Sequence, residues 1–178
     1  MGLSPVRSAK PSAIATGEPA KAVSEPAIPA TAPEEPIDQN LWWVVPGRLA
    51  GVRKPTAAEL PALQQAGISA IVSLTDDPGN LDWYAATGIP HLWLPVKGGT
   101  APTHEQLAAF GEFMAANGGG IAVHCASGRR RTGAFLATWL VCKGSSAEAA
   151  IAAIQTANPA VELREAQITI LHELAANR

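Results

Sequence analysis

Cysteine is scarce in this sequence of 178 residues, which contains two cysteines and no Cys-x-x-Cys pair. This scarcity argues against both a disulfide framework and a zinc ribbon, and it favours a reducing, cytoplasmic setting. Three of the histidines, His91, His104 and His172, show no metal-ligand spacing. We therefore expect no metal ion and no other cofactor.

Charged residues are few as well: they make up 16% of the chain, and the net charge is −2. That balance argues against a general nucleic-acid binder, which would normally carry a basic face. No apolar run approaches the roughly 18 residues that span a membrane, and the first residues, MGLSPVRSAK, lack the apolar core of a secretory signal. We expect a monomer with no nucleic-acid partner and no membrane span, whose partner is its substrate.

Aromatic residues are absent from residues 1–36, which hold seven of the 15 prolines. A segment of this composition cannot bury enough apolar surface to offset the entropy that it loses on ordering. We therefore predict a disordered Pro/Ala-rich tail over residues 1–36. The other residues, 37–178, form one globular domain by length, and the hydrophobic share of the chain, 47%, is enough for a sizeable core.

The globular part alternates strand and helix patterns. Short apolar and β-branched runs predict strands at residues 41–45, 48–52, 68–74, 89–95 and 120–125. Capping and breaker signals predict helices at about residues 56–66, 81–87, 103–117, 131–144, 145–158 and 161–176. Pro61 predicts an irregular first turn in the first of them. Strands separated by helices imply an α/β fold, with a small, mostly parallel sheet flanked by helices.

The segment HCASGRRRTG, residues 124–133, joins the last predicted strand to the apolar helix that follows it. Open parallel sheets bind ligands at this edge, and a helix start offers unpaired amides with a partial positive charge. The small residues Ala126, Ser127 and Gly128 let the loop curl so that successive amides point inward. Arg131 can donate two parallel hydrogen bonds to two phosphate oxygens. The segment therefore predicts a binding site for a tetrahedral dianion.

Cys125 lies at the floor of this predicted site. A cysteine that closes a buried strand is more often a small apolar core residue, but the arginine, the glycine and the strand-to-helix context favour a reactive thiol here. A helix N-terminus and nearby cations lower the pKa of a thiol from its usual value of about 8.5, and His124 can fix the loop around the sulfur. Thiolate attack on phosphorus would give a thiophosphate that water hydrolyses. Cys142, in the apolar helix, is interpreted as structural.

Residues 124–133 resemble the H-C-x5-R-[ST]-G signature of cysteine-dependent protein phosphatases. In this resemblance Cys125 matches the nucleophile, Arg131 the phosphate-binding arginine, and Thr132 the hydroxyl that helps to release the sulfur. Residues 40–178 are similar in order and spacing to a compact dual-specificity phosphatase of a type associated with bacteria, especially cyanobacteria. The resemblance implies the dual-specificity phosphatase architecture and hydrolysis of phosphotyrosine, with phosphoserine and phosphothreonine as further substrates.

The chain departs from that family at the general acid. Phosphatases of this superfamily usually carry an aspartate in the loop after the strand equivalent to residues 89–95, and this aspartate protonates the leaving oxygen. Here the loop reads PVKGGTAP and contains no carboxylate. Lys97 stands about where the acid belongs, and it could instead neutralise phosphate charge.

The nearest alternative acids are Asp76 and Asp77, in the loop after residues 68–74, with Asp82 as a weaker candidate. That strand is predicted to run parallel to the catalytic one, so its loop opens on the same edge of the sheet. Ordinary turn chemistry explains the Asp-Asp-Pro-Gly-Asn sequence equally well. Between the two neighbours, the Pro-Gly turn that follows slightly favours Asp77.

Two classes of function remain open. The first is an enzyme that hydrolyses phosphotyrosine, or a polyanionic non-protein substrate such as a phosphoinositide, since Arg129 and Arg130 add positive charge to the lip of the loop. The second is a pseudophosphatase that binds phosphorylated partners without turnover. The missing aspartate supports the second class, whereas Cys125 and Arg131 support the first.

Overall fold

The computed structural model describes residues 35–177, and the predicted tail over residues 1–36 lies outside that range except for its last two residues. The described residues contain one five-stranded sheet. Its strands are β1 (Trp42–Val45), β2 (Leu49–Val52), β3 (Ile68–Ser73), β4 (His91–Trp93) and β5 (Gly120–His124). They confirm the five predicted strands, each within about two residues of the predicted ends.

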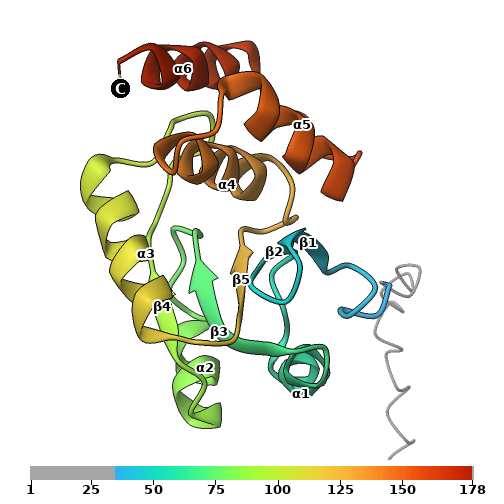
Figure 1. Ribbon diagram of the computed structural model, residues 1–178. Helices are drawn as coiled ribbons and strands as arrows, with labels where there is room; N and C mark the ends of the chain where they lie inside the picture. The colour runs from blue at the N-terminus through green and yellow to red at the C-terminus, as the bar shows by residue number, and fades with distance from the viewer. Residues whose placement is uncertain (1–34, 178) are drawn as a thin grey trace, which may run out of the picture. The chain divides into compact units, whose positions relative to one another are not determined.

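The last strand in sequence lies at the centre of the sheet (Figure 1), in the order β1-β2-β5-β3-β4. β5 pairs in parallel with β2 on one side and with β3 on the other, and β4 continues the parallel part beyond β3. Only β1, at the edge, runs antiparallel to its neighbour β2. The predicted α/β fold with a mostly parallel sheet is therefore confirmed.

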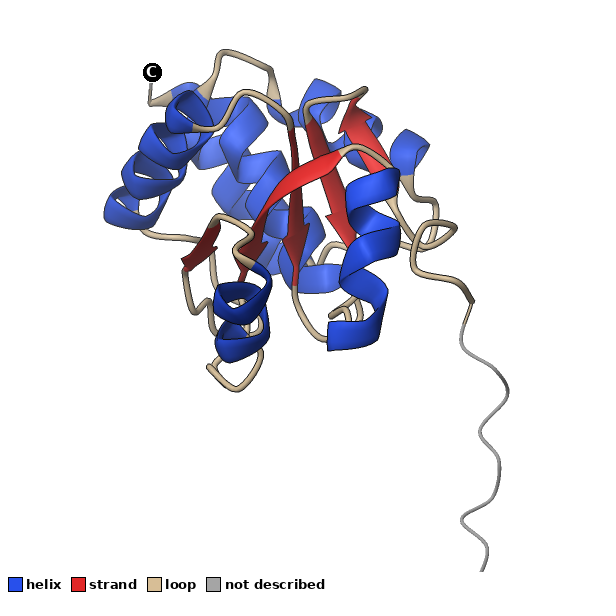
Figure 2. Ribbon diagram, turned by 90° about the horizontal axis from the view of Figure 1, so that it is seen from below, coloured by secondary structure: helices blue, strands red, loops and turns tan. Residues whose placement is uncertain are grey.

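Helices cover both faces of this sheet (Figure 2). They are α1 (Leu60–Gln65), α2 (Leu81–Thr87), α3 (His104–Ala116), α4 (Arg130–Cys142), α5 (Ala147–Ala157) and α6 (Glu165–Ala176). Successive side chains of a strand point to opposite faces, so Ile121 and Val123 join the core beneath α3, α4, α5 and α6, whereas Ala122 joins the core beneath α1 and α2. The two apolar layers hold the central strand in place from both sides.

Local signals set the helix starts. Thr103 accepts a hydrogen bond from the Gln106 amide at 3.2 Å, and the Gln106 side chain accepts one from the Thr103 amide at 3.0 Å, which is the predicted capping box of α3. Pro61 lies in the first turn of α1. A 3-10 turn, Ala57–Glu59, precedes α1, so the irregular start that the proline predicts is confirmed.

Two predictions from the sequence were wrong. The last helix begins at Glu165 and not near Val161, because Val161 is buried against α4, where a Cβ on Gly133 would lie 2.4 Å from a Val161 methyl group. Residues 161–164 therefore belong to no helix, and α6 starts after Arg164. Cys142, interpreted as structural, is exposed, because it is the last residue of α4 and faces away from the core.

Candidate phosphate-binding site

The loop after β5 and the start of α4 form the floor of a pocket at the carboxyl edge of the sheet. Gly128 has φ +65°, and a Cβ there would lie 2.3 Å from the backbone carbonyl group of Val52. Only glycine fits such a close approach in this conformation. The Trp42 indole donates a hydrogen bond to the Gly128 carbonyl at 3.1 Å. The curled loop expected from the small residues is thus held against β2.

The sulfur of Cys125 lies at the base of this loop, and the residue is 2% exposed. Burial by itself raises the pKa of the Cys125 thiol, but hydrogen bonds to the sulfur more than offset it, so that the pKa is lowered. The donors are the Thr132 hydroxyl and the backbone amides of Thr132, Arg129 and Gly128. The Thr132 hydroxyl is buried and has no other hydrogen-bond partner among the described residues, so nothing competes with the sulfur for it.

His124 lies behind the loop and does not line the pocket. Its Nδ1 atom donates to the Cys125 carbonyl oxygen at 3.2 Å, so Nε2 carries the lone pair that the Tyr84 hydroxyl meets at 2.8 Å and Asn80 Nδ2 at 3.1 Å. Burial lowers the pKa of His124 to about 4. The imidazole is therefore neutral at physiological pH, and it fixes the Cys125 backbone without competing for the phosphate charge.

Asn80 and Tyr84 were missed by the sequence analysis, which placed them in a turn and in a helix without a role. Asn80 also donates to the Tyr84 hydroxyl at 2.8 Å and contacts the Ser73 hydroxyl at 3.4 Å. Ser73 in turn shares a hydrogen bond with Thr75 at 2.9 Å. No sequence motif marks this network, because its members come from β3, α2 and β5. The feature of this network that stands out in the sequence is Tyr84, the only tyrosine in the chain.

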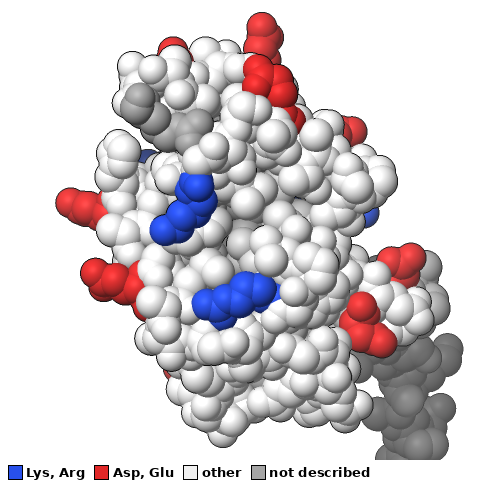
Figure 3. Space-filling model, viewed as in Figure 1, with Lys and Arg blue, Asp and Glu red and all other residues white. Residues whose placement is uncertain are grey.

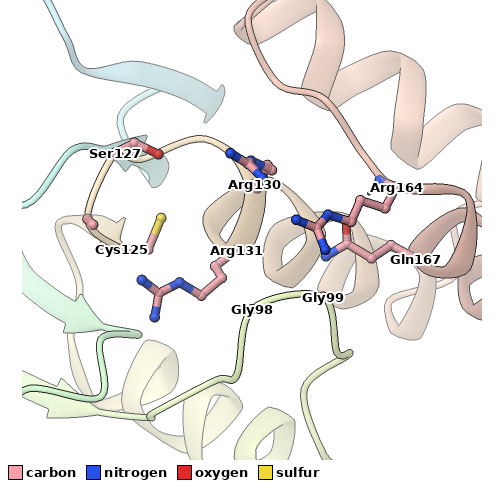
Figure 4. Close-up of a pocket in the computed structure, with 9 residues that line it drawn as sticks. Gly98, Gly99, Cys125, Ser127, Arg130, Arg131, Arg164 and Gln167 are labelled. Atoms are coloured by element: carbon pink, nitrogen blue, oxygen red, sulfur yellow. Dashed lines mark hydrogen bonds between the residues drawn. The ribbon is translucent and has the colours of Figure 1, made fainter.

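Arg131 reaches across the carboxyl ends of the neighbouring strands. Its Nη1 atom makes long contacts with the carbonyl oxygens of Leu74 at 3.4 Å and Val96 at 3.5 Å. The same atom lies 3.8 Å from a carboxylate oxygen of Asp76. These partners orient the guanidinium beside the sulfur (Figure 4).

The pocket has a volume of about 170 Å³. It is lined by Gly98, Gly99, Cys125, Ala126, Ser127, Arg130, Arg131, Arg164 and Gln167. Five of these were predicted as site residues, whereas Gly98, Gly99, Arg164 and Gln167 were not. The two glycines belong to the loop that lacks the acid, and the other two come from the start of α6, at least 33 residues from the signature arginine. Sequence spacing could not bring them together.

Two of the predicted cations lie outside this pocket. Arg129 lines two neighbouring depressions with Ser127. Its backbone amide, not its side chain, is what faces Cys125. Lys97 is exposed and is not among the residues that line the pocket.

The two candidate acids have different surroundings. Asp77 accepts a hydrogen bond from the Gly79 amide at 2.8 Å and lies 3.4 Å from Lys54 Nζ. The amide and then the lysine lower the pKa of the Asp77 carboxyl, which is fully exposed. Asp76, in contrast, turns its carboxylate toward Arg131. Asp77, which the sequence slightly favoured, is thus held in the turn, and Asp76 is the carboxylate beside Arg131.

Residues 35–177 contain neither a cluster of metal-ligating side chains nor a membrane-spanning helix. In that range no group of three or more His, Cys, Asp and Glu side chains is placed to hold a metal ion. No helix there is long and apolar enough to cross a membrane.

Comparisons with known proteins agree with this geometry. A family model described as "PTP-SAK: Swiss Army Knife protein, DSP-PTPase phosphatase domain" matches residues 38–177. Tk-PTP in its active form is 27% identical, with a TM-score of 0.67 over 78% of this chain and 98% of that chain. TpbA of P. aeruginosa is 27% identical, with a TM-score of 0.57 over 78% and 91%. Human DUSP28, at 24% identity and a TM-score of 0.57 over 78% and 94%, is similar in fold.

Proposed function

Since the chain belongs to the DSP-PTPase phosphatase family, we propose that it hydrolyses phosphomonoesters through a covalent phosphate on Cys125, with phosphotyrosine in proteins as the first substrate to test. The observation that carries this proposal is the state of the sulfur. It is buried at the base of an arginine-lined pocket, and its pKa is nevertheless lowered. A cysteine buried among apolar groups alone would have a raised pKa and would be inert.

The proposed reaction has two displacement steps. The Cys125 thiolate attacks phosphorus, an S–P bond forms, and the P–O bond to the leaving group breaks. Water then attacks phosphorus, the S–P bond breaks, and the sulfur recovers its negative charge as phosphate leaves. The loop amides and the Arg131 guanidinium bind the non-bridging oxygens through both steps. The Thr132 hydroxyl, which helps to lower the pKa of the Cys125 thiol, stabilises the departing thiolate.

We assign the leaving-group proton to Asp76. The support is its position: among the described carboxylates, it is the one that forms an ion pair with Arg131. A bound phosphate dianion takes over the guanidinium, which releases the carboxylate from its ion pair with Arg131. Asp76 then protonates the leaving oxygen in the first step and accepts a proton from the attacking water in the second.

Turnover of an aryl phosphate tests the proposal. The wild-type chain is expected to release phosphate, and Cys125→Ser is expected to lose that activity below detection, because a serine hydroxyl stays protonated at neutral pH. The matched control is Cys142→Ser, which changes the other cysteine, exposed at the far end of α4. It is expected to keep full activity. A phosphotyrosine peptide, measured beside phosphoserine and phosphothreonine peptides, then tests the substrate class.

Absence of turnover by the wild-type chain, together with binding of phosphate or phosphopeptide, would identify a binding module instead. A phosphate-labelled enzyme trapped at low pH, present in the wild type and absent in Cys125→Ser, would establish the covalent intermediate. Equal activity of Cys125→Ser and the wild type would exclude the mechanism.

A further inference from the structure

The pocket contains more positive charge than one phosphate group requires. Three arginines line it, Arg130, Arg131 and Arg164, and no aspartate or glutamate is among its lining residues. In the proposed function, the loop amides and Arg131 already bind the reacting phosphate. The guanidinium groups of Arg130 and Arg164 therefore line the same cavity but have no role in binding the reacting phosphate.

Arg164 is the more informative of the two. It precedes α6, and its backbone amide donates to the Gln167 side chain at 3.0 Å, which fixes the chain direction at this point. Its guanidinium lies against the loop across the pocket from α6, since a Cβ on Gly99 would be 3.4 Å from Arg164 Nη1. No carboxylate among residues 35–177 forms an ion pair with it. The guanidinium thus lies beside Gly99, and within residues 35–177 its charge has no acidic partner.

Arg130 supports the same conclusion less strongly. It lines the pocket, and it also borders a neighbouring depression to which Glu162 contributes. It forms no ion pair within the described part of the chain. Figure 3 shows the wider charge distribution on one face of the molecule: the basic side chains gather near its middle, and the acidic ones lie toward its edge.

The loop between the sulfur and Arg164 leaves room for a ligand. It carries Gly98 and Gly99 where side chains would otherwise project, and a Cβ on Gly98 would have nothing within 4 Å. Gly99 has φ +88°, which disfavours any larger residue there. Figure 4 shows Arg164 and the two glycines bordering the same opening as Cys125. A compact carbon skeleton can therefore extend from the phosphate over the glycines to Arg164.

We propose that the substrate is a small phosphomonoester that carries a second phosphate on the same skeleton, and that Arg164, assisted by Arg130, binds this second phosphate while Cys125 attacks the first. The inference rests on the proposed function and specifies its substrate. A small molecule fits the observations better than a phosphopeptide, because Arg130 and Arg164, although exposed, line the same cavity as the sulfur. A guanidinium that binds phosphate through two hydrogen bonds adds specificity as well as affinity.

Phenyl phosphate and the 1,2-, 1,3- and 1,4-isomers of phenylene bisphosphate test this assignment, since the three isomers place the second phosphate at three distances. At least one isomer is expected to exceed phenyl phosphate in kcat/KM by about 10- to 100-fold, the range for a charge-assisted hydrogen bond. The advantage is expected in KM, because the second phosphate is remote from the reacting atoms. It should shrink as the salt concentration rises.

Variants locate the effect. Arg164→Gln is expected to remove most of the bisphosphate advantage while phenyl phosphate turnover stays within about twofold, and Arg164→Lys is expected to restore part of it, as a point charge does. The control is Lys143→Gln, which removes the same charge from the exposed end of α4, where Lys143 lies over Trp139. It is expected to keep the full advantage. Thermal unfolding of each variant confirms that the fold is intact.

The outcomes separate the two proposals. Hydrolysis of phenyl phosphate with no isomer preferred would overturn the second-phosphate site and leave the proposed function standing. A preference that survives Arg164→Gln would overturn the assignment to Arg164. A preference that depends on Arg164 but is seen only with phosphotyrosine peptides carrying acidic neighbours would overturn the small-molecule substrate. Failure to hydrolyse phenyl phosphate at all would overturn the proposed function, and this inference with it.

Discussion

The loops after β5 and after β3 open on the same edge of the sheet, but they contribute to the site in different ways: the first lines the pocket, and the second contacts Arg131. The β5 loop presents the backbone amides of Gly128, Arg129 and Thr132 to the sulfur, and Gly128 packs closely against the backbone of β2. In the β3 loop, single side chains act separately. Asp76 turns its carboxylate to Arg131, whereas its neighbour Asp77 contacts Gly79 and Lys54. An anion-binding loop built from backbone amides can be predicted from a contiguous stretch of sequence. The position of a single acidic side chain depends instead on residues that pack around it from other parts of the chain.

The two aspartates test that difference most strongly. Asp76→Asn is expected to slow hydrolysis of an alkyl or tyrosyl phosphate by about 10²–10⁴. It should barely affect an ester of an acidic phenol, whose oxygen leaves without a proton. Asp77→Asn is the matched control, and it is expected to change either rate by less than tenfold, because its carboxylate is already held in the turn. The measurement is kcat/KM for both esters.

A different pattern would assign Asp76 another role. If Asp76→Asn slows both esters by the same factor, the carboxylate acts by orienting Arg131 and not as a proton donor. If Asp77→Asn shows the dependence on the leaving group, the acid is the neighbour that the sequence favoured. The basic limb of the pH–rate profile gives a second readout, since it should disappear only in the variant that has lost the acid.

Arg131→Lys changes the β5 loop while keeping its charge. We expect kcat for an aryl phosphate to fall by about 10²–10³, because an ammonium group cannot replace two parallel hydrogen bonds to the transferring phosphoryl group. Unlike Asp76→Asn, this variant should slow good and poor leaving groups alike. A loss smaller than tenfold would mean that the amides alone bind the phosphate, and that the arginine is less important than its position suggests.

The hydrogen-bond network around Asn80 connects the two loops, and its branches can be broken separately. Tyr84→Phe removes the hydroxyl that contacts His124, and we expect a loss of about fivefold for both classes of ester, the equivalent of one hydrogen bond. Thr75→Val removes the hydroxyl that donates to the Asp77 carbonyl at 3.0 Å. Its effect should fall mainly on the ester with the poor leaving group. Equal behaviour of the two variants would show that the loops are not separable.

The smallest effect at neutral pH is on stability. The pKa of His124 is about 4 in the folded chain, against about 6.5 when unfolded. Below the unfolded value only the unfolded chain gains the proton, so the free energy of unfolding should fall as the pH drops from about 6.5 toward 4, by up to about 3 kcal/mol. His124→Asn should flatten this limb and the control His91→Asn should keep it, as denaturant unfolding at several pH values can measure.

Contiguous sequence was enough to predict much of the fold. Residues 68–74 are apolar and rich in β-branched side chains, a pattern typical of a strand that is buried on both faces of a parallel sheet. The capping pair Thr103 and Gln106 placed the start of α3 because its hydrogen bonds are local. The start of α6 was misplaced because Val161 is removed from the helix by its packing against α4, a contact between segments that are about 28 residues apart.

The sequence by itself determined the loop from Cys125 to Arg131, the residues that we propose as nucleophile and phosphate ligand, because the conformation of residues 124–133 depends on neighbours along the chain. Tertiary structure alone decided which aspartate faces Arg131, which cations line the pocket, and that Arg164 meets Gly99 there. The physical reason is that these contacts join loops from different strands and helices. Their separations are set by the register of the sheet and by the packing of α6 on α4, and neither is expressed in any one stretch of sequence.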